Sequence, residues 1–333
     1  MGSECDKVLK VKAVALFSGG LDSILAVRLI QELGIDVRGV TFETPFFSAI
    51  KAKDAADRIG LPLTIINFTE VHLEMLKAPR YGYGRNMNPC IDCHTLMLKH
   101  AGRFMEEIGA CFIITGEVLG QRPMSQGKQT LYVVAKNSGY QDYIVRPLSA
   151  KLLPETKPEQ DGLLDRERLM DIQGRGRKAQ MRMADQFGVT TYANPAGGCL
   201  LTDPEFSKRL KELFQNQPGY SIRDIELLKY GRHFRLPGAV KAVVGRNKSD
   251  NEGIKKLYRT GDTLIRMETY PGPTVLITGA CNNESLHISA SLCALYSDAP
   301  KDQDVTAVYG TDEAFISINV RAASRETAAG LII

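Results

Sequence analysis

The feature that most constrains the fold is the alternation of strand-like and helix-like segments in the first part of the chain. Apolar runs typical of buried strands occupy residues 11–17, 36–42, 63–68 and 110–117. The segments between them include residues 22–34, 48–60 and 90–109, which are typical of helices. Parallel strands need such helical crossovers. We therefore predict an α/β fold with a doubly wound, Rossmann-like parallel sheet, whose ligands bind at the carboxyl ends of the strands.

The first strand ends in the sequence FSGGLDS, residues 17–23. A tight turn at Gly19 and Gly20 leads into a helix, and the backbone N–H groups at a helix N-terminus bind anions. The hydroxyls of Ser18 and Ser23 are further donors. The segment is neither a Walker A loop nor a dinucleotide fingerprint. It predicts a phosphate site, and the alternative is a turn whose Ser and Asp residues only cap the helix.

The organisation of the chain changes after about Pro204. Residues 154–188 have a helical pattern rich in Arg and Lys, and a loop that carries Cys199 follows. Beyond this loop, strand-like segments become shorter and are separated by proline–glycine turns. We predict two domains, residues 1–203 with the parallel sheet and residues 204–333 as a smaller α+β domain.

The composition favours a protein of a reducing compartment. The seven cysteines are an odd number in a chain of 333 residues, which argues against a disulfide scaffold. No apolar run approaches the roughly 18 residues that a membrane-spanning helix needs. We therefore expect a cytoplasmic protein that has no membrane partner.

Three cysteines are candidates for chemistry. Cys90 and Cys93 form a C-x-x-C at the start of a predicted helix, where the helix N-terminus is expected to lower the thiol pKa, and Cys199 follows Gly-Gly in a loop. The C-x-x-C is compatible with a zinc site completed elsewhere, a redox or persulfide pair, an iron–sulfur site, or two thiols that only cap the helix. If all three converge at the sheet edge, they can hold a 4Fe–4S cluster with one open iron. Packed or incidental thiols are expected for the remaining cysteines, Cys5, Cys111, Cys281 and Cys293.

Positive charge is concentrated in two places. Residues 230–266 contain nine Lys or Arg and three Asp or Glu, whereas residues 267–333 contain three and eight. A second cluster comprises Arg175, Arg177, Lys178 and Arg182, of which the first three are RNA-binding candidates. Such clusters suit a polyanionic partner, and a merely solvated surface is the alternative.

The string S-G-G-x-D-S after a first strand resembles the PP-loop of the ATP pyrophosphatase family. The resemblance implies that ATP, with Mg²⁺, is cleaved between its α and β phosphates and that an oxygen of the substrate is adenylated. It places pyrophosphate among Ser18, Gly19, Gly20, Asp22 and Ser23, and adenine near Thr41 and Phe42.

A later segment, FIITGEVLGQRPMSQ (residues 112–126), resembles the TGE-x-LGQ segment of tRNA 4-thiouridine synthetases. This resemblance implies contacts of Thr115, Gly116 and Gln121 with the nucleotide or the substrate uridine. The following IVRPLSAK (residues 144–151) is similar to the R-P-L segment of the same enzymes. It makes Arg146 and Lys151 weaker candidates, which are alternatively surface charges.

The C-terminal segments of residues 231–257 and 270–277 resemble the RNA-binding domain of NFACT-type proteins. The local excess of positive charge agrees with a surface that contacts phosphates. The RNA-binding candidates of this domain are Arg232, Arg235, Lys241, Arg246 and Lys248.

These resemblances together imply an ATP-dependent tRNA sulfurtransferase that forms 4-thiouridine. The catalytic candidates are Asp22, Cys90, Cys93 and Cys199, and these cysteines are also the expected ligands of a 4Fe–4S cluster. The expected cofactors are ATP, Mg²⁺ and the cluster. The expected partners are tRNA and a sulfur donor, either free sulfide or a persulfide carrier, and a homodimer is left open.

The sequence shows neither the amino-terminal RNA-binding extension nor the rhodanese domain of bacterial synthetases, and its cysteine pattern resembles cluster-bearing thiolases. One alternative is a cluster-free 2-thiouridylase with a Cys93/Cys199 persulfide pair. Another is a PP-loop synthetase that acts on a small molecule, and a third is an RNA-binding protein without activity.

Overall fold

The structure is a computed structural model that describes residues 11–122, 124–192, 198–310 and 314–333. Two compact units divide the chain, one ending at Thr202 and the other comprising Asp203–Ile333. Cys5 lies outside the described residues. Within the described part of the chain, no helix has the length and hydropathy needed to cross a membrane.

The N-terminal unit is built on a five-stranded parallel sheet in the order β3-β2-β1-β4-β5. The strands are β1 (Lys12–Leu16), β2 (Asp36–Glu43), β3 (Leu63–Asn67), β4 (Phe112–Thr115) and β5 (Ile144–Val145). The central strand β1 pairs with β2 and β4, so the strand order reverses beside it. The predicted parallel α/β sheet is confirmed, and its switch point lies where FSGGLDS begins.

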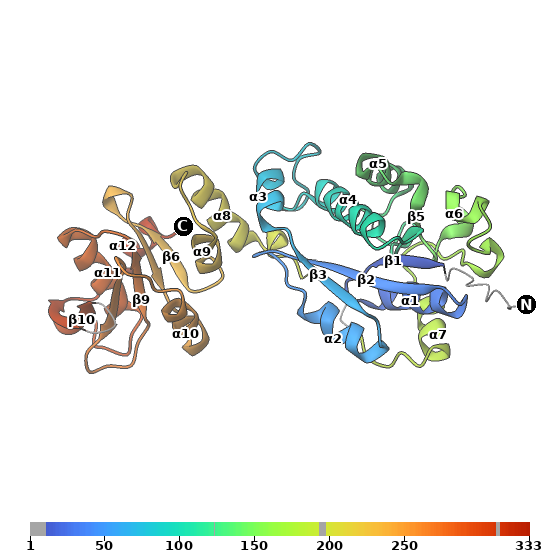
Figure 1. Cartoon of the computed structure of the whole chain (residues 1–333). Coiled ribbons are helices and arrows are strands. Elements are labelled where there is room, and N and C mark those ends of the chain that lie inside the picture. The colour runs from blue at the N-terminus through green and yellow to red at the C-terminus, as the bar shows by residue number, and fades with distance from the viewer. Residues whose placement is uncertain (1–10, 123, 193–197, 311–313) are drawn as a thin grey trace, which may run out of the picture. The chain divides into compact units, whose positions relative to one another are not determined.

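Helices cover both faces of this sheet (Figure 1). One face carries α1 (Leu21–Glu32), α2 (Ile50–Ile59) and α7 (Lys178–Gln186), and the other carries α3 (Thr69–Lys77), α4 (Cys90–Glu107) and α5 (Lys128–Ser138). The two hydrophobic cores correspond to these two layers. Apolar residues such as Val14 and Ile113 are fully buried, as expected for strands that are covered on both sides.

The continuous helical pattern predicted for residues 154–188 is wrong. After the 3₁₀ turns η1 (Gln141–Tyr143) and η2 (Ala150–Leu152), the chain forms only the four-residue helix α6 (Lys157–Gln160) and the 3₁₀ turn η3 (Arg166–Arg168) before α7. Gly162 and Gly174 adopt φ values of +70° and +79°, and this left-handed conformation ends helices. The connection therefore runs as an irregular segment along the edge of the sheet.

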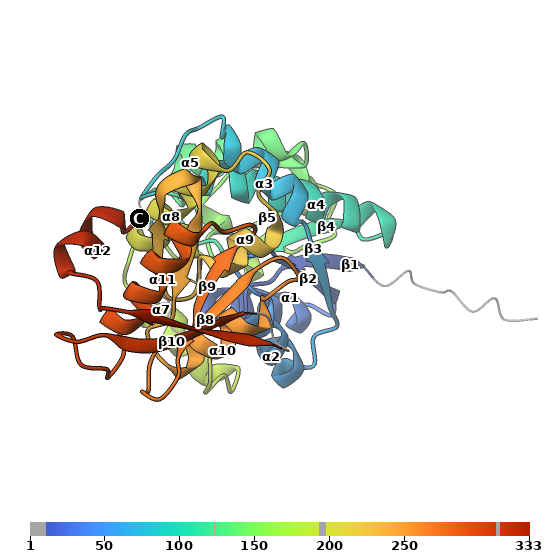
Figure 2. The same ribbon diagram turned by 90° about the vertical axis from the view of Figure 1, so that its left-hand side faces the viewer.

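The C-terminal unit is a six-stranded antiparallel sheet in the order β11-β10-β8-β9-β7-β6. Its strands are β6 (Arg232–Arg235), β7 (Lys241–Val244), β8 (Thr263–Met267), β9 (Val275–Thr278), β10 (Val305–Gly310) and β11 (Phe315–Val320). The helices are α8 (Pro204–Asn216), α9 (Ile222–Leu227), α10 (Lys248–Lys256), α11 (Asn283–Leu295) and α12 (Arg325–Leu331), with short 3₁₀ turns at Leu200–Thr202 (η4, in the N-terminal unit) and Pro237–Ala239 (η5). Helix α11 packs on β7 to β11 (Figure 2). The predicted smaller α+β domain is confirmed.

Candidate nucleotide and thiol site

The FSGGLDS turn has the form of an anion cradle. Gly19 has a φ of +73°, and a Cβ on it would lie 2.4 Å from the carbonyl oxygen of Lys51 in α2, so glycine is required at this position. Gly20 is the N-cap of α1, and the Ser23 hydroxyl donates to its carbonyl oxygen at 2.8 Å. The Ser18 hydroxyl lies 3.3 Å from that of Ser23. The two hydroxyls and the first turn of α1 therefore lie together at the carboxyl end of β1.

The second motif meets the first through Gly116. A Cβ on Gly116 would lie 2.5 Å from the backbone nitrogen of Ser23 and 2.6 Å from the carbonyl carbon of Asp22. Only glycine lets the end of β4 approach the start of α1 this closely. The TGE segment and the FSGGLDS turn, although far apart in sequence, thus form one site.

Asp22 is the meeting point of three segments. Its Oδ2 atom accepts a hydrogen bond from Gln121 Nε2 at 2.9 Å and lies 3.4 Å from Arg177 Nη2. The segment before α7 is held against this site, because Gly174 N–H donates to the Leu119 carbonyl at 2.7 Å. Arg177, which we grouped by sequence with the RNA-binding candidates, therefore lies beside the FSGGLDS turn, whereas Arg175 and Lys178 are exposed.

Two oxygens of this site are suited to a cation. Asp22 Oδ1 and Gln121 Oε1 are buried and have no hydrogen-bond partner among the described residues. Carboxylate and amide oxygens are ligands for Mg²⁺, which also takes oxygens from bound phosphates. The pair therefore fits the metal that the sequence predicts with ATP.

Glu117 of the TGE segment organises a buried polar network. Its Oε2 atom accepts from Arg146 Nε at 2.9 Å and from the Thr115 hydroxyl at 3.1 Å, and its Oε1 lies 3.4 Å from His94 Nδ1. Burial opposes the charge of Glu117, but Arg146 and His94 outweigh it and lower the Glu117 pKa to about 2. Arg146 also donates to the Leu131 carbonyl. The alternative of a surface charge is therefore wrong for Arg146, which is buried.

Replacement of Glu117 by Gln is expected to destabilise the N-terminal unit by about 3–5 kcal/mol, because it leaves the Arg146 charge buried without compensation. The lowered pKa contributes stability above the ordinary value of 4.5, and this contribution is lost as the pH falls toward 2. Chemical unfolding between pH 7 and pH 3 should therefore show the difference from wild type shrinking below pH 4.5. The control Glu74→Gln breaks the exposed pair with Lys77 and should change stability by less than about 1 kcal/mol. Equal stability of Glu117→Gln and wild type at pH 7 would contradict this expectation.

The structure brings Cys199 to the loop that precedes α4. Asn86 donates to the Thr202 carbonyl at 2.7 Å, and Met87 N–H donates to the Leu201 carbonyl at 3.2 Å. Cys90 and Cys93 lie in the first turn of α4. All three thiols are free and close enough for their charges to interact.

The thiol pKa values do not follow the sequence-based expectation. Burial raises the pKa of all three thiols. The pKa of Cys93 lies well above its ordinary range, and the pKa of Cys199 is raised to about 11. Repulsion from the other thiolates contributes for Cys93 and Cys199, and Arg122 lowers the Cys90 value only in part. The expected lowering by the helix N-terminus is therefore wrong here, because desolvation outweighs it. The thiols are therefore protonated at neutral pH unless a metal ion or cluster binds them.

The types of ligand atom near these thiols bear on which metal ion or cluster they could bind. No group of three or more His, Cys, Asp or Glu in the described part of the chain is arranged to hold a metal ion. His94 Nδ1 contacts Glu117, a contact that leaves its Nε2 atom uninvolved. Three cysteine sulfurs are the ligand type of iron–sulfur clusters. The donor type therefore agrees with the cluster that the sequence analysis expects.

The remaining candidates of the N-terminal unit have other surroundings. Thr41 is buried in β2, and Phe42 packs against Phe68 with ring centroids 4.8 Å apart. The Thr115 hydroxyl donates its hydrogen bond to Glu117. Lys151 is exposed and donates to the Glu167 carbonyl at 2.7 Å. Adenine binding near Thr41 and Phe42 stays a prediction.

The RNA-binding candidates of the C-terminal unit differ in exposure. Lys241 is only 3% exposed, and burial lowers its pKa to about 8, so its inclusion in a phosphate-contacting surface is corrected. Arg235 pairs with Glu212, Arg246 pairs with Asp250, and Arg232 lies over the Tyr296 ring. Lys248 is exposed. Exposed cations that the sequence analysis missed are Lys255, Lys256 and Arg259.

Two family models match this chain, one in the N-terminal unit and one in the C-terminal unit. Residues 9–151 match the family described as "Thiamine biosynthesis protein (ThiI)", and residues 231–330 match the "NFACT protein RNA binding domain". The chain thus contains one segment similar to the ThiI family and another similar to the NFACT RNA-binding domain. The FSGGLDS turn and the TGE segment both lie in the segment that matches ThiI, and Lys248 and α10 lie in the segment that matches the NFACT domain.

The curated relatives include enzymes with two names. The "tRNA-specific 2-thiouridylase MnmA" of Xanthobacter autotrophicus is 25% identical over 291 residues, which cover 80% of this chain and 70% of that protein. The "Probable tRNA sulfurtransferase" of Caldanaerobacter subterraneus is 27% identical over 201 residues, or 49% of this chain and 51% of the relative. The chain thus spans about half the length of the latter.

Among solved structures, a 4-thiouridine synthetase–RNA complex with bound ATP is similar with a TM-score of 0.39 and 22% identity. The similarity covers 66% of this chain and 52% of that one.

Proposed function

We propose that the protein is an ATP-dependent tRNA sulfurtransferase that converts a uridine to 4-thiouridine. The observation that carries the proposal is the contact of the FSGGLDS turn with the TGE segment, in a unit where Cys90, Cys93 and Cys199 lie close to one another. The same chain contains segments similar to the ThiI family and to the NFACT RNA-binding domain. The names of the curated relatives support thiolation of tRNA but do not distinguish 4-thiouridine from 2-thiouridine.

The nucleotide half of the site would bind ATP through the first turn of α1 and the hydroxyls of Ser18 and Ser23. The uridine carbonyl oxygen attacks the α phosphorus, the bond to the β-phosphate oxygen breaks, and pyrophosphate leaves. Backbone N–H groups at the helix N-terminus stabilise the charge on the departing pyrophosphate. Asp22 and Gln121 would hold Mg²⁺, which neutralises phosphate charge when bound.

Arg177 is the cation best placed to assist this step. It pairs with Asp22, and a bound polyphosphate would compete for its guanidinium. We therefore assign Arg177 to the phosphates of ATP, whereas Arg175 and Lys178 stay RNA-binding candidates.

Arg177→Gln is expected to weaken ATP binding roughly 10- to 100-fold, because it removes charge-assisted hydrogen bonds to phosphate. Isothermal titration calorimetry with ATP measures the effect. Lys178→Gln, which changes an exposed neighbour, is the matched control and should leave ATP affinity unchanged. Unaltered ATP affinity in Arg177→Gln, together with weakened tRNA binding, would return Arg177 to the RNA-binding group.

The thiol half would supply sulfur. Cys90, Cys93 and Cys199 would hold a 4Fe–4S cluster, which when bound carries the sulfide to be transferred. Cys93 is buried and Cys90 and Cys199 are half-buried, which limits the access of water that competes for the adenylated carbon. In the product the carbon–sulfur bond has replaced the carbon–oxygen bond, and AMP has left with the oxygen.

A second candidate is a cluster-free 2-thiouridylase. It is favoured by the 2-thiouridylase relative that aligns with 80% of the chain and by the electrostatic coupling of Cys93 with Cys199. One thiol would carry a persulfide and give up its outer sulfur, and the other would close a disulfide that an external thiol reductant reopens. Anaerobic purification separates the candidates, because bound iron supports the cluster, whereas a colourless, active protein supports the persulfide pair.

Nucleoside mass spectrometry tests the activity itself. tRNA incubated with protein, ATP, Mg²⁺ and sulfide should acquire 4-thiouridine, and pyrophosphate release should require tRNA. Appearance of 2-thiouridine instead would select the second candidate. Pyrophosphate release that is indifferent to tRNA would favour a small-molecule synthetase.

A further inference from the structure

A cavity of about 440 Å³ lies beside β5, the edge strand of the N-terminal sheet. Its floor is apolar and includes Leu131 of α5, Ile144 of β5 and Ala150 of η2. A volume of this size is typical of small-molecule pockets. The lining residues include none of the FSGGLDS turn or the three candidate cysteines. The cavity is therefore separate from the nucleotide and thiol site.

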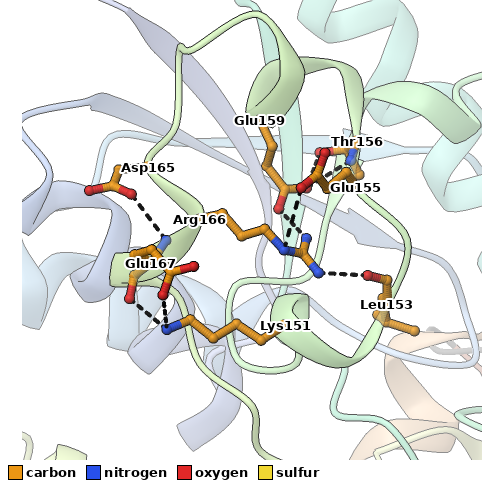
Figure 3. A network of polar contacts seen from close by, with 8 residues as sticks. All are labelled: Lys151, Leu153, Glu155, Thr156, Glu159, Asp165, Arg166 and Glu167. Carbon is orange, nitrogen blue, oxygen red and sulfur yellow. Dashed lines mark hydrogen bonds and ion pairs between the residues drawn. The ribbon is translucent and has the colours of Figure 1, made fainter.

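One wall of the cavity is held in place by a polar network in the irregular connection after β5 (Figure 3). Glu159 accepts hydrogen bonds from Thr156 N–H at 2.8 Å and from Arg166 Nη1 at 2.5 Å. Arg166 also donates to the Leu153 carbonyl at 2.8 Å, and Lys151 donates to the Glu167 carbonyl. Since Leu153, Thr156 and Glu159 line the cavity, the network makes this wall rigid before any ligand arrives. Long irregular connections in compact domains are usually functional.

The rim combines an aromatic ring with hydrogen-bonding groups. The Tyr132 side chain lines the cavity and is 52% exposed, and Lys136 Nζ lies over its ring, 6.0 Å from the centroid, so one face of the ring remains for stacking. Gln129, Gln141 and Asp142 are exposed at the rim, and Glu155, whose Oε1 atom lies 4.0 Å from Arg166 Nε, also lines the cavity. Aromatic rings stack on bases, and Asp, Glu and Gln side chains bind amino groups of base edges. An apolar floor with such a rim suits a planar ring that bears hydrogen-bond donors.

We propose that this cavity binds an unstacked nucleobase that carries an exocyclic amino group, separate from the uridine that is modified. The inference rests on the proposed function where the base belongs to the RNA substrate. A base of the RNA and a free nucleoside present the same chemistry. The carboxylates of Asp142 and Glu155 favour adenine, cytosine or guanine over uracil, which lacks an amino group.

Arg146 connects the cavity with the polar network that supports the nucleotide site. Arg146 lines the cavity and donates to Glu117, and Glu117 follows the glycine that packs on the FSGGLDS turn. A base that occupies the cavity therefore lies next to the network that supports the TGE segment.

The test uses the full-length protein with its ATP site saturated by a non-hydrolysable ATP analogue. One arm measures binding of adenosine, cytidine and uridine by saturation-transfer NMR, and the other measures binding of oligo(A), oligo(U) and tRNA by fluorescence anisotropy. Tyr132→Ala is expected to weaken binding of the amino-bearing probes roughly tenfold, and Tyr132→Phe should retain it because the ring remains. Asp142→Asn should reduce the preference for adenine over uracil, whereas the control Asp57→Asn, on α2, should not.

The two arms distinguish the sources of the base. Effects in the RNA arm assign the cavity to a nucleotide of the RNA, and effects on nucleosides alone assign it to a free nucleoside. Unchanged binding in both arms for Tyr132→Ala and Asp142→Asn would overturn the proposal. Failure of the proposed function is seen separately, as absence of tRNA-dependent pyrophosphate release by the wild-type protein.

Discussion

Asp22→Asn is expected to reduce tRNA-dependent pyrophosphate release by roughly 10²- to 10³-fold. The substitution keeps the size of the side chain but removes the charge on which Gln121 and Arg177 converge. It also removes the carboxylate that, with Gln121 Oε1, offers the buried oxygens suited to Mg²⁺. The reaction should be followed as pyrophosphate release with saturating ATP and tRNA.

The effect should lie in the chemical step and in metal dependence rather than in folding. The Asp22 side chain is 18% exposed and its pair with Arg177 is stretched, so its loss should cost less than about 1 kcal/mol of stability. Raising the Mg²⁺ concentration should recover part of the activity of Asp22→Asn. Asp57→Asn changes an exposed carboxylate of α2 and should keep wild-type activity. Wild-type pyrophosphate release by Asp22→Asn would remove Asp22 from the reaction.

Each of the substitutions Cys199→Ser, Cys90→Ser and Cys93→Ser is expected to separate sulfur transfer from adenylation. The thionucleoside yield should fall by roughly 10³-fold or more, as when a reacting group is removed. Pyrophosphate release should stay within a few fold of wild type, because the FSGGLDS turn and Asp22 are unchanged. Parallel assays of pyrophosphate and of thionucleosides in the same tRNA sample measure the separation.

Cys281→Ser is the matched control for these variants. Cys281 is a free thiol of the C-terminal unit whose sulfur lies 3.4 Å from the Thr263 hydroxyl, so serine can keep this contact. It should retain both activities. Cys90→Ser further separates the two mechanisms, since a Cys93/Cys199 persulfide pair predicts that this variant keeps thiolation, whereas a cluster with three ligands predicts its loss. Full thiolation by Cys199→Ser would contradict both mechanisms.

Much of the nucleotide site was predictable because its residues are contiguous in sequence. The turn at Gly19 and Gly20 follows from a strand, a glycine pair and a helix start that are adjacent along the chain. The TGE segment was recognisable in the same way at Thr115 and Gly116. The network around Glu117 was not predicted, because a buried acid next to a glycine carries no sequence signal of its partners Arg146 and His94. The position of Arg177 was missed because its neighbours Arg175 and Lys178 made it one member of a basic cluster.

The C-terminal candidates show the same limit. Clustering of positive charge between residues 230 and 266 agreed with an NFACT RNA-binding domain. Charge counts do not reveal pairing, and the structure pairs Arg235 with Glu212 and Arg246 with Asp250. Lys241 lies in β7 and is buried, although its neighbours in sequence gave no sign of this.

The alternation of strands and helices, the glycine turn at the end of β1 and the change from an α/β to a smaller α+β unit could be predicted from the sequence. These are properties of short segments, set by hydrophobic period and by glycine. Tertiary packing brings Gly116 against the start of α1, Arg177 to Asp22, and Cys199 to Cys90 and Cys93. The same holds for the raised thiol pKa values, because desolvation depends on everything that packs around a group. Such contacts join residues that are distant in sequence, and only the packing of the whole unit brings them together.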